Sequence, residues 1–177
     1  FIENELRLGV NEGKSAVASP TKRKFLGYSF YYKKGTYRLR VHPKSLNRLK
    51  DKVREVTNRN VSMNFETRLK KLIEKTRGWV NYFKLADMSK SLKEMDGWIR
   101  RRLRACIWKT WKKIRTRFTS LNKLGIDRNK AWEFANTRKG YWRISNSPIM
   151  QRSITNERLE KRGYVSMSTM YKKVILA

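Results

Sequence analysis

The chain has 177 residues, with 44 Lys and Arg, 14 Asp and Glu and one His, which give a formal net charge of +30. Its hydrophobic share of 39% supplies enough apolar material for a folded core, which disfavours a disordered basic tail. A body with this charge repels itself unless a polyanion neutralises it. Nucleic acid is therefore the leading partner class.

Several other classes are disfavoured. No apolar run approaches the roughly 18 residues of a membrane-spanning helix, and residues 1–10 lack the basic and apolar regions of a signal peptide. The lone Cys106 cannot form an intramolecular disulfide, which fits a reducing compartment. We expect a cytoplasmic location, in a bacterium by general expectation, with an organelle as the alternative. One Cys and one His cannot supply the about four ligands of a structural zinc site. Because the chain begins at Phe1 rather than Met, we expect a piece of a longer protein.

Residues 1–43 indicate the edge of a mixed α/β unit. A helix end is expected over residues 1–6. Two runs rich in β-branched and aromatic residues, 24–32 and 36–41, flank a turn that contains Gly35, which predicts a β-hairpin. Because a single hairpin is unstable alone, it must pack on neighbouring elements.

From Pro43 onward the pattern is helical. Pro43 suits the first turn of a helix whose apolar residues recur every three or four positions up to Val56. A second helix is predicted to start at Asn64, a suitable N-cap, and to continue to Phe83. Gly78 lowers the helix propensity of this run, so we expect close packing at that position.

The third predicted helix spans residues 89–118 and is strongly basic. Its apolar stripe comprises Met95, Ile99, Leu103, Ile107, Trp111, Ile114 and Phe118. Its other faces carry nine cations: Arg100, Arg101, Arg102, Arg104, Lys109, Lys112, Lys113, Arg115 and Arg117. No acid occurs between Trp98 and Asp127. A solvated helix face usually mixes charge signs, so this face favours nucleic acid over a membrane surface or bare solvent.

The remaining chain is predicted as short helices and one basic loop. Asp127 caps a helix that continues to residue 135, and residues 136–145 form a loop with three cations and two aromatic rings. Its cations are expected to contact RNA or DNA, whereas Tyr141 and Trp142 either stack on bases or anchor the loop to the core. Ser147 begins a helix over residues 149–161, Gly163 ends it, and a last helix covers 166–175.

The residues offer no convincing active site. The segment from Gly9 to Lys14 and Ser15 has three residues between its glycines, whereas a phosphate-binding loop needs four. Asp87, Glu94 and Asp96 are the nearest approach to an acidic cluster, and we expect them to serve helix starts and ion pairs. Cys106 lies beside an apolar stripe and is expected to belong to the core.

Four strings, in order, resemble the reverse transcriptase/maturase proteins encoded by group II introns. Residues 11–15 (NEGKS) with 24–28 (KFLGY) resemble the end of their polymerase palm. Residues 78–83 (GWVNYF) resemble the core of the maturase-specific domain, or thumb, which 98–104 (WIRRRLR) and 108–112 (WKTWK) continue. Residues 135–142 (ANTRKGYW), followed by Ser147 and Pro148, resemble the segment beyond it.

The resemblance implies a mainly α fold: a short N-terminal β-hairpin as a palm remnant, a thumb-like helical bundle and further short helices. It implies three regions: the palm edge over 1–43, the maturase-specific thumb over 44–124 and a basic nucleic-acid-binding segment over 125–177. Phe25, Leu26, Gly27 and Tyr28 would form a primer-grip-like hairpin. We expect nucleic-acid contacts from Lys14, Arg100, Arg101, Arg102, Arg104, Lys109, Lys112, Lys113, Arg115, Arg138, Lys139, Tyr141, Trp142 and Arg143.

The implied partners are group II intron RNA, an RNA/DNA template–primer duplex and target DNA. The family's metal-binding aspartates have no counterpart here, so no catalytic residue and no cofactor is expected, and Mg²⁺ would enter only with a palm or with intron RNA. The resemblance thus implies an RNA-binding maturase module that binds intron RNA and template–primer duplex and assists intron splicing and mobility. Two alternatives to this function stay open. One is the thumb of an RNA-directed DNA polymerase completed by a separate fingers-palm chain, and the other is a generic basic nucleic-acid-binding protein.

Overall fold

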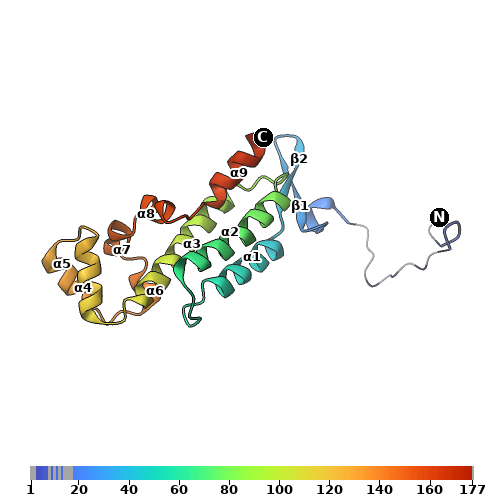
Figure 1. Cartoon of the computed structure of the whole chain (residues 1–177). Coiled ribbons are helices and arrows are strands. Elements are labelled where there is room, and N and C mark those ends of the chain that lie inside the picture. The colour runs from blue at the N-terminus through green and yellow to red at the C-terminus, as the bar shows by residue number, and fades with distance from the viewer. Residues whose placement is uncertain (1–2, 8, 10, 12, 14–17, 177) are drawn as a thin grey trace.

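A computed structural model describes residues 3–7, 9, 11, 13 and 18–176. A two-stranded hairpin is followed by helices, which confirms the predicted fold class. The molecule is elongated, with the hairpin at one end of a helical bundle and the α4–α5 pair at the other (Figure 1). No helix among the described residues is long and apolar enough to cross a membrane.

The hairpin pairs β1 (Tyr28–Lys33) with β2 (Thr36–Val41) in antiparallel register. Lys34 (φ 49°) and Gly35 (φ 79°) both adopt positive φ, as a two-residue hairpin turn requires. The first strand begins at Tyr28 instead of the predicted residue 24, because residues 25–27 form a tight turn after the short 3₁₀ helix η1 (Pro20–Lys22). The Asp87 N–H donates to the Leu39 carbonyl at 2.8 Å, which ties the hairpin to the connection between α2 and α3.

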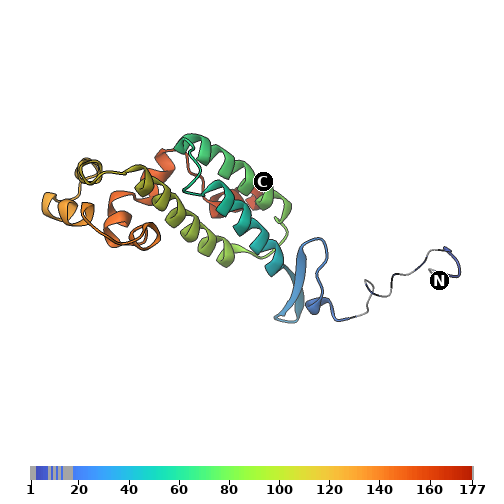
Figure 2. The same cartoon turned by 90° about the horizontal axis from the view of Figure 1, so that it is seen from below.

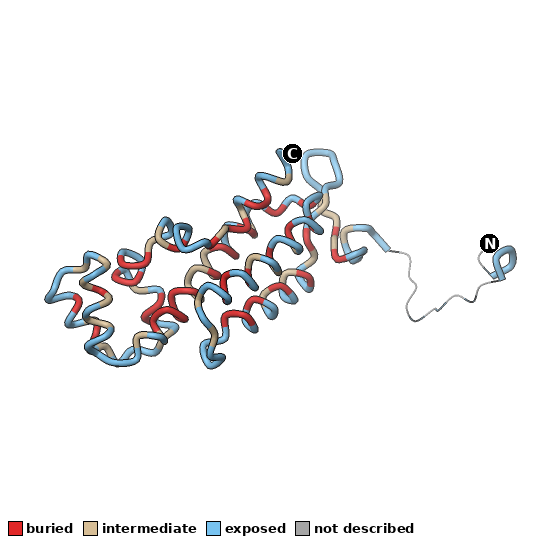
Figure 3. The backbone as a smooth tube through the Cα atoms, viewed as in Figure 1, coloured by how far each residue is buried: buried red, intermediate tan, exposed pale blue. Residues whose placement is uncertain are grey.

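Three long helices form the bundle: α1 (Pro43–Val56), α2 (Phe65–Tyr82) and α3 (Ser89–Thr110). Asn64 caps α2 as predicted, its side chain accepting from the Glu66 N–H at 3.0 Å. Their inward faces bury the apolar stripes read from the sequence. Figure 2 shows α1, α2 and α3 side by side, and Figure 3 marks the buried residues along them in red. The bundle thus follows directly from the three- to four-residue spacing.

A fourth helix, α9 (Met167–Leu176), completes the bundle by packing on α2 and α3. Asp96 of α3 caps it: its carboxylate accepts from the Met167 N–H at 2.7 Å and the Ser168 N–H at 3.0 Å. The Tyr164 hydroxyl donates to the same carboxylate at 3.2 Å. Asp96 is 3% exposed and therefore serves the fold, in line with the structural role expected for this acid.

The single helix predicted over residues 89–118 is wrong. The structure ends α3 at Thr110 and starts α4 (Ile114–Lys123) after an extended Lys113. At the break, Trp111 packs edge-on against Trp108, with 5.6 Å between ring centroids. The guanidinium of Arg117 then donates from Nε to the freed Trp111 carbonyl at 3.0 Å. These contacts replace the helical hydrogen bonds that the chain gives up there.

The rest of the chain is divided more finely than predicted. Residues 141–144 form a helical turn inside the predicted loop, and the predicted 149–161 helix is interrupted at Ile154 and Thr155. Asp127 and Ser147 cap their helices as expected. Gly163 takes a positive φ of 98° after the helix that ends at Lys161. The elements are α5 (Arg128–Ala135), α6 (Tyr141–Ile144), α7 (Pro148–Ser153) and α8 (Asn156–Lys161).

Candidate nucleic-acid interface

The basic helix α3 does not send all its cations to the surface. Arg104 is only 8% exposed. Its Nε donates to the Ile154 carbonyl at 2.8 Å and its Nη2 to Asn156 Oδ1 at 3.2 Å. Burial lowers the pKa of Arg104, and repulsion from Arg100 lowers it further. The structure therefore places Arg104 inside the fold, joining α3 to the α7–α8 connection, whereas we expected it on the surface.

Arg102 is also engaged with the fold. Its Nε donates to Thr57 Oγ1 at 2.5 Å, and its Nη2 reaches the Arg54 carbonyl at 3.4 Å. Burial lowers the pKa of Arg102, and repulsion from Arg54 and Arg59 adds to this effect. Arg102 thereby links α3 to the C-terminal end of α1 while keeping part of its guanidinium in solvent.

The two rings of α6 pack on cations of neighbouring elements. The Arg101 guanidinium lies 3.8 Å from the centre of the Trp142 ring and donates to the Trp142 carbonyl at 2.9 Å. Tyr141 receives Arg59 at 5.3 Å and Lys109 at 4.9 Å from its ring centre. The rings therefore anchor the segment to α3, and Trp142 still keeps 38% of its surface exposed. Arg100 and Arg101 are partly exposed.

The other predicted cations lie on the surface beyond this point. Lys109 is partly exposed, and the exposed group comprises Lys112, Lys113, Arg115, Arg138, Lys139 and Arg143. In the described part of the chain, ion pairs are formed only by Arg38, Arg54 and Lys75, and none involves this group. These charges are thus free to meet a polyanion. Lys14, also predicted as a contact, lies outside the described residues.

The primer-grip-like segment forms a tight, locked turn. Phe25 and Tyr28 exchange backbone hydrogen bonds of 3.1 and 2.8 Å, and Leu26 (φ 49°) and Gly27 (φ 86°) both take positive φ. A Cβ on Gly27 would lie 3.0 Å from the Phe83 ring, so only glycine fits. The turn presents exposed Phe25 and Leu26 side chains at the end of the bundle.

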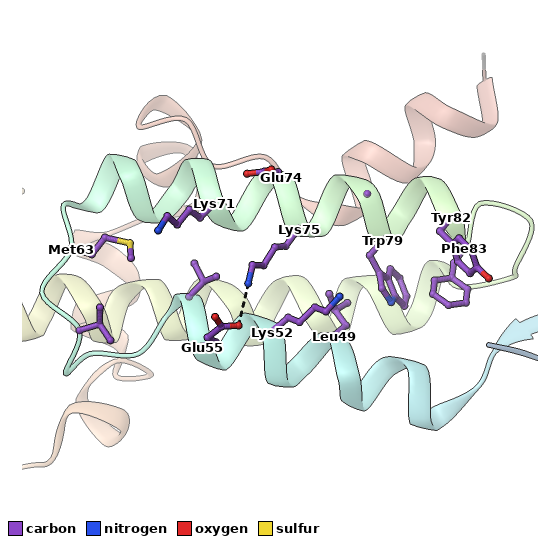
Figure 4. A pocket seen from close by; sticks show the side chains of 13 residues that line it. Leu49, Lys52, Glu55, Met63, Lys71, Glu74, Lys75, Trp79, Tyr82 and Phe83 are labelled. Carbon is purple, nitrogen blue, oxygen red and sulfur yellow. Dashed lines mark hydrogen bonds and ion pairs between the residues drawn. The ribbon is translucent and has the colours of Figure 1, made fainter. Parts of the chain in front are cut away.

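A groove of about 800 Å³ runs between α1 and α2 from this end (Figure 4). Leu49, Trp79 and Phe83 supply apolar walls, and Lys75 pairs with Glu55 across it at 3.1 Å. Gly78 also lines the groove, and a Cβ there would meet nothing within 4 Å. The expectation of close packing at Gly78 is therefore wrong.

Sequence reasoning missed one residue of the basic surface, Arg59. It lies in the connection between α1 and α2, for which we predicted no contact, yet its guanidinium lies over the Tyr141 ring of α6. An arginine in a polar Asn-Arg-Asn connection was the available signal. Among the described residues, no group of three or more His, Cys, Asp or Glu is placed to hold a metal ion.

The family comparison bears on the segment that builds this surface. Residues 46–125, from α1 to the end of α4, match the family described as "Group II intron, maturase-specific domain". This segment is therefore similar to the maturase-specific domain of group II intron proteins. A comparison with curated proteins found no match. The maturase-specific domain thus supplies α3 and the Arg59 connection, and the chain beyond it supplies α6.

Proposed function

We propose that this maturase module binds the RNA of a group II intron and thereby assists its splicing. The binding surface comprises Arg59, residues 109–115 from the end of α3 to the start of α4, and residues 138–143. The observation that carries the proposal is the unpaired charge on this surface within, and directly beside, the maturase-specific domain. Its cations replace the counterions of RNA phosphates, which gives affinity with a steep salt dependence.

Phosphate contacts alone carry little sequence information, so specificity must come from RNA shape and from unpaired bases near exposed rings. Assistance in splicing is then preferential binding: the module shifts the RNA population toward the fold that it binds best. The RNA supplies the splicing chemistry, and Mg²⁺ arrives with the RNA. We propose that the protein acts in the same compartment as its intron transcript, which for a bacterial intron is the cytoplasm.

A second role is favoured by the opposite end of the molecule. The locked turn at Phe25–Tyr28 opens onto the α1–α2 groove, whose neighbouring hollow of about 480 Å³ is lined by Lys24, Arg48 and Lys52. We propose that this end contacts a template–primer duplex, or target DNA, when a fingers-palm unit is present. Primer extension that appears only when such a unit is added would support this role.

The test is equilibrium binding of the full chain to a structured group II intron RNA across a KCl series, with excess random RNA and duplex DNA as competitors. We expect tight binding that survives the competitors. Replacing Lys112 and Lys113 by Gln should reduce the slope of log affinity against log salt by about 2. The matched control replaces Lys33 and Lys34, an equally exposed lysine pair in the hairpin turn.

The control pair should leave intron RNA affinity nearly unchanged, since it lies at the far end of the bundle (Figure 1). Equal losses from the two pairs would show that binding follows net charge alone. If excess random RNA displaced all of the bound intron RNA, the protein would be a generic polycation without preference for the intron.

A further inference from the structure

Three arginines converge where α1 ends. Arg102 reaches from α3 to the Thr57 hydroxyl at 2.5 Å. Arg59 follows two residues after Thr57, and Arg54 lies one turn before it. Repulsion from Arg54 and Arg59 helps to lower the pKa of Arg102, so these cations act on one another. Arg54 is ion-paired with Asp51 at 2.6 Å, so Arg59 and Arg102 are the two cations here whose proximity favours an anion between them.

A small cavity opens at this point. It measures about 150 Å³ and is lined by Thr57, Arg59, Arg102, Ala105 and Trp142. One water needs about 10–15 Å³ of such accessible space, so the cavity is large enough for a phosphate group with part of its hydration. No carboxylate lines the cavity, and the small Ala105 side chain leaves room above α3.

A larger cavity lies on the other side of Arg59. The neighbour, about 350 Å³, shares Arg59 and is lined by Arg68, Lys109 and Lys112, again without an acid. Arg59, which lines both cavities, and Lys109, which lines the larger one, both lie over the Tyr141 ring. The α1–α2 groove differs, since two glutamates line it. The path past Arg59 therefore suits a chain of phosphates better than that groove does.

Donors remain available in the smaller cavity. Apart from its packing on Tyr141, Arg59 forms no hydrogen bond or ion pair with any other residue that the structure describes. Arg102 uses Nε and Nη2 internally, which leaves its Nη1. A guanidinium pairs with phosphate oxygens through two parallel hydrogen bonds, and the Tyr141 ring already holds Arg59 in place. Binding therefore costs little side-chain entropy.

We propose that this cavity binds one phosphate group of an unpaired RNA strand, between Arg59 and Arg102, with the strand continuing past Tyr141 toward Lys109. The proposal rests on the RNA binding proposed above and gives it a defined contact. An unpaired strand fits because its phosphates can enter a recess, whereas those of a duplex lie on a regular outer surface. The exposed part of Trp142 offers a ring to the adjacent base.

The test compares Arg59→Gln with Arg128→Gln. Arg128 is an exposed arginine on α5, and its replacement changes the charge by the same amount. The probes are an oligouridylate of about 12 nucleotides and a group II intron RNA. Arg59→Gln should weaken both about tenfold or more, and Arg128→Gln much less. Arg59→Lys should recover only part of the loss, because lysine cannot form the paired contact. Equal losses from Arg59→Gln and Arg128→Gln would overturn the proposal.

A second measurement distinguishes binding of an RNA strand in this cavity from binding of free inorganic phosphate. The indole N–H signal of Trp142 is followed by NMR during titration with inorganic phosphate and, separately, with the oligouridylate. Both should shift it in the unmodified chain and neither in Arg59→Gln, which should melt at the unchanged temperature. A shift with phosphate alone would overturn the RNA strand as the source. If oligouridylate shifts the signal but intron RNA does not bind, the proposed function fails and the phosphate site stands.

Discussion

Replacing Arg104 by Met removes a buried cation that faces no carboxylate. Two hydrogen bonds from a charged donor, to the Ile154 carbonyl and to Asn156, are lost, each worth about 1.5–3 kcal/mol. Against this, the variant no longer has to keep a guanidinium out of water, a penalty of several kcal/mol for an isolated ion. The Ile154 carbonyl stays buried and loses its partner, which costs about 1–3 kcal/mol. We therefore expect a net loss of about 2 kcal/mol in the free energy of unfolding.

For a chain of this size, 1 kcal/mol moves the melting temperature by about 2–4 °C, so Arg104→Met should melt about 4–8 °C lower. Thermal unfolding followed by circular dichroism measures this shift. The control, Arg100→Met, removes the same charge from a partly exposed site on the same helix and should leave the melting temperature nearly unchanged. Because Arg104 is buried, intron RNA affinity should stay close to that of the unmodified chain at a temperature where the variant is folded. An unchanged melting temperature together with a large loss of RNA affinity would refute this reasoning.

Three further outcomes are expected. Asp96→Ala removes the cap of α9 and should lower the free energy of unfolding by about 2–4 kcal/mol in urea denaturation, whereas Asp96→Asn, which keeps an oxygen acceptor, should lose less. Gly27→Ala combines a strained φ of 86° with a Cβ 3.0 Å from Phe83 and Ser45, so it should cost about 1–3 kcal/mol; a neutral effect would show that this turn relaxes freely. Burial raises the pKa of Cys106, so its thiolate is scarce in the folded chain. Alkylation by iodoacetamide, measured by mass spectrometry at about pH 8.5, should be slow in the native protein and fast in denaturant. Equal rates in the two conditions would contradict the burial of Cys106.

Local signals were sufficient for most of the elements. The hairpin is marked by Gly35 between two strand-like runs, and Asn64, Asp127 and Ser147 start their helices as capping side chains. These features depend on residues within a few positions of one another, so a sequence displays them directly.

The break after Thr110 could not be predicted in this way. Ile114 and Phe118 keep the apolar spacing of α3, so periodicity continues through a point where the helix stops. The contacts that stabilise the break come from Arg117, whose guanidinium caps the Trp111 carbonyl and lies 4.9 Å from the Trp108 ring centre. Thr155 is different: its side chain caps α8 by accepting from the Arg158 N–H, and a threonine at that position was a readable signal.

The basic character of the interface was evident from the sequence. Which of its arginines bind within the fold and which lie on the surface was not. Arg101, Arg102 and Arg104 are neighbours with identical chemistry. What separates them is that α3 is covered on several sides, by α1, α6 and α9, so its flanking positions face protein and not solvent. Burial on more than one side is a property of the assembled bundle, and only the three-dimensional structure assigns each guanidinium to the fold or to the surface.

The position of α9 in the bundle has a consequence for synthesis of the protein. Its Met167, Met170 and Tyr171 complete a core that α2 and α3 begin, and the Tyr171 hydroxyl donates to the Ala86 carbonyl at 2.6 Å. On the ribosome, α2 and α3 emerge well before Met167 is translated. Until then the nascent chain exposes the apolar surface of α2 and α3 that α9 later covers, and the Asp96 carboxylate lacks its partners from residues 164–168. If translation stops before Met167, the incomplete bundle therefore exposes apolar surface of the kind that chaperones bind.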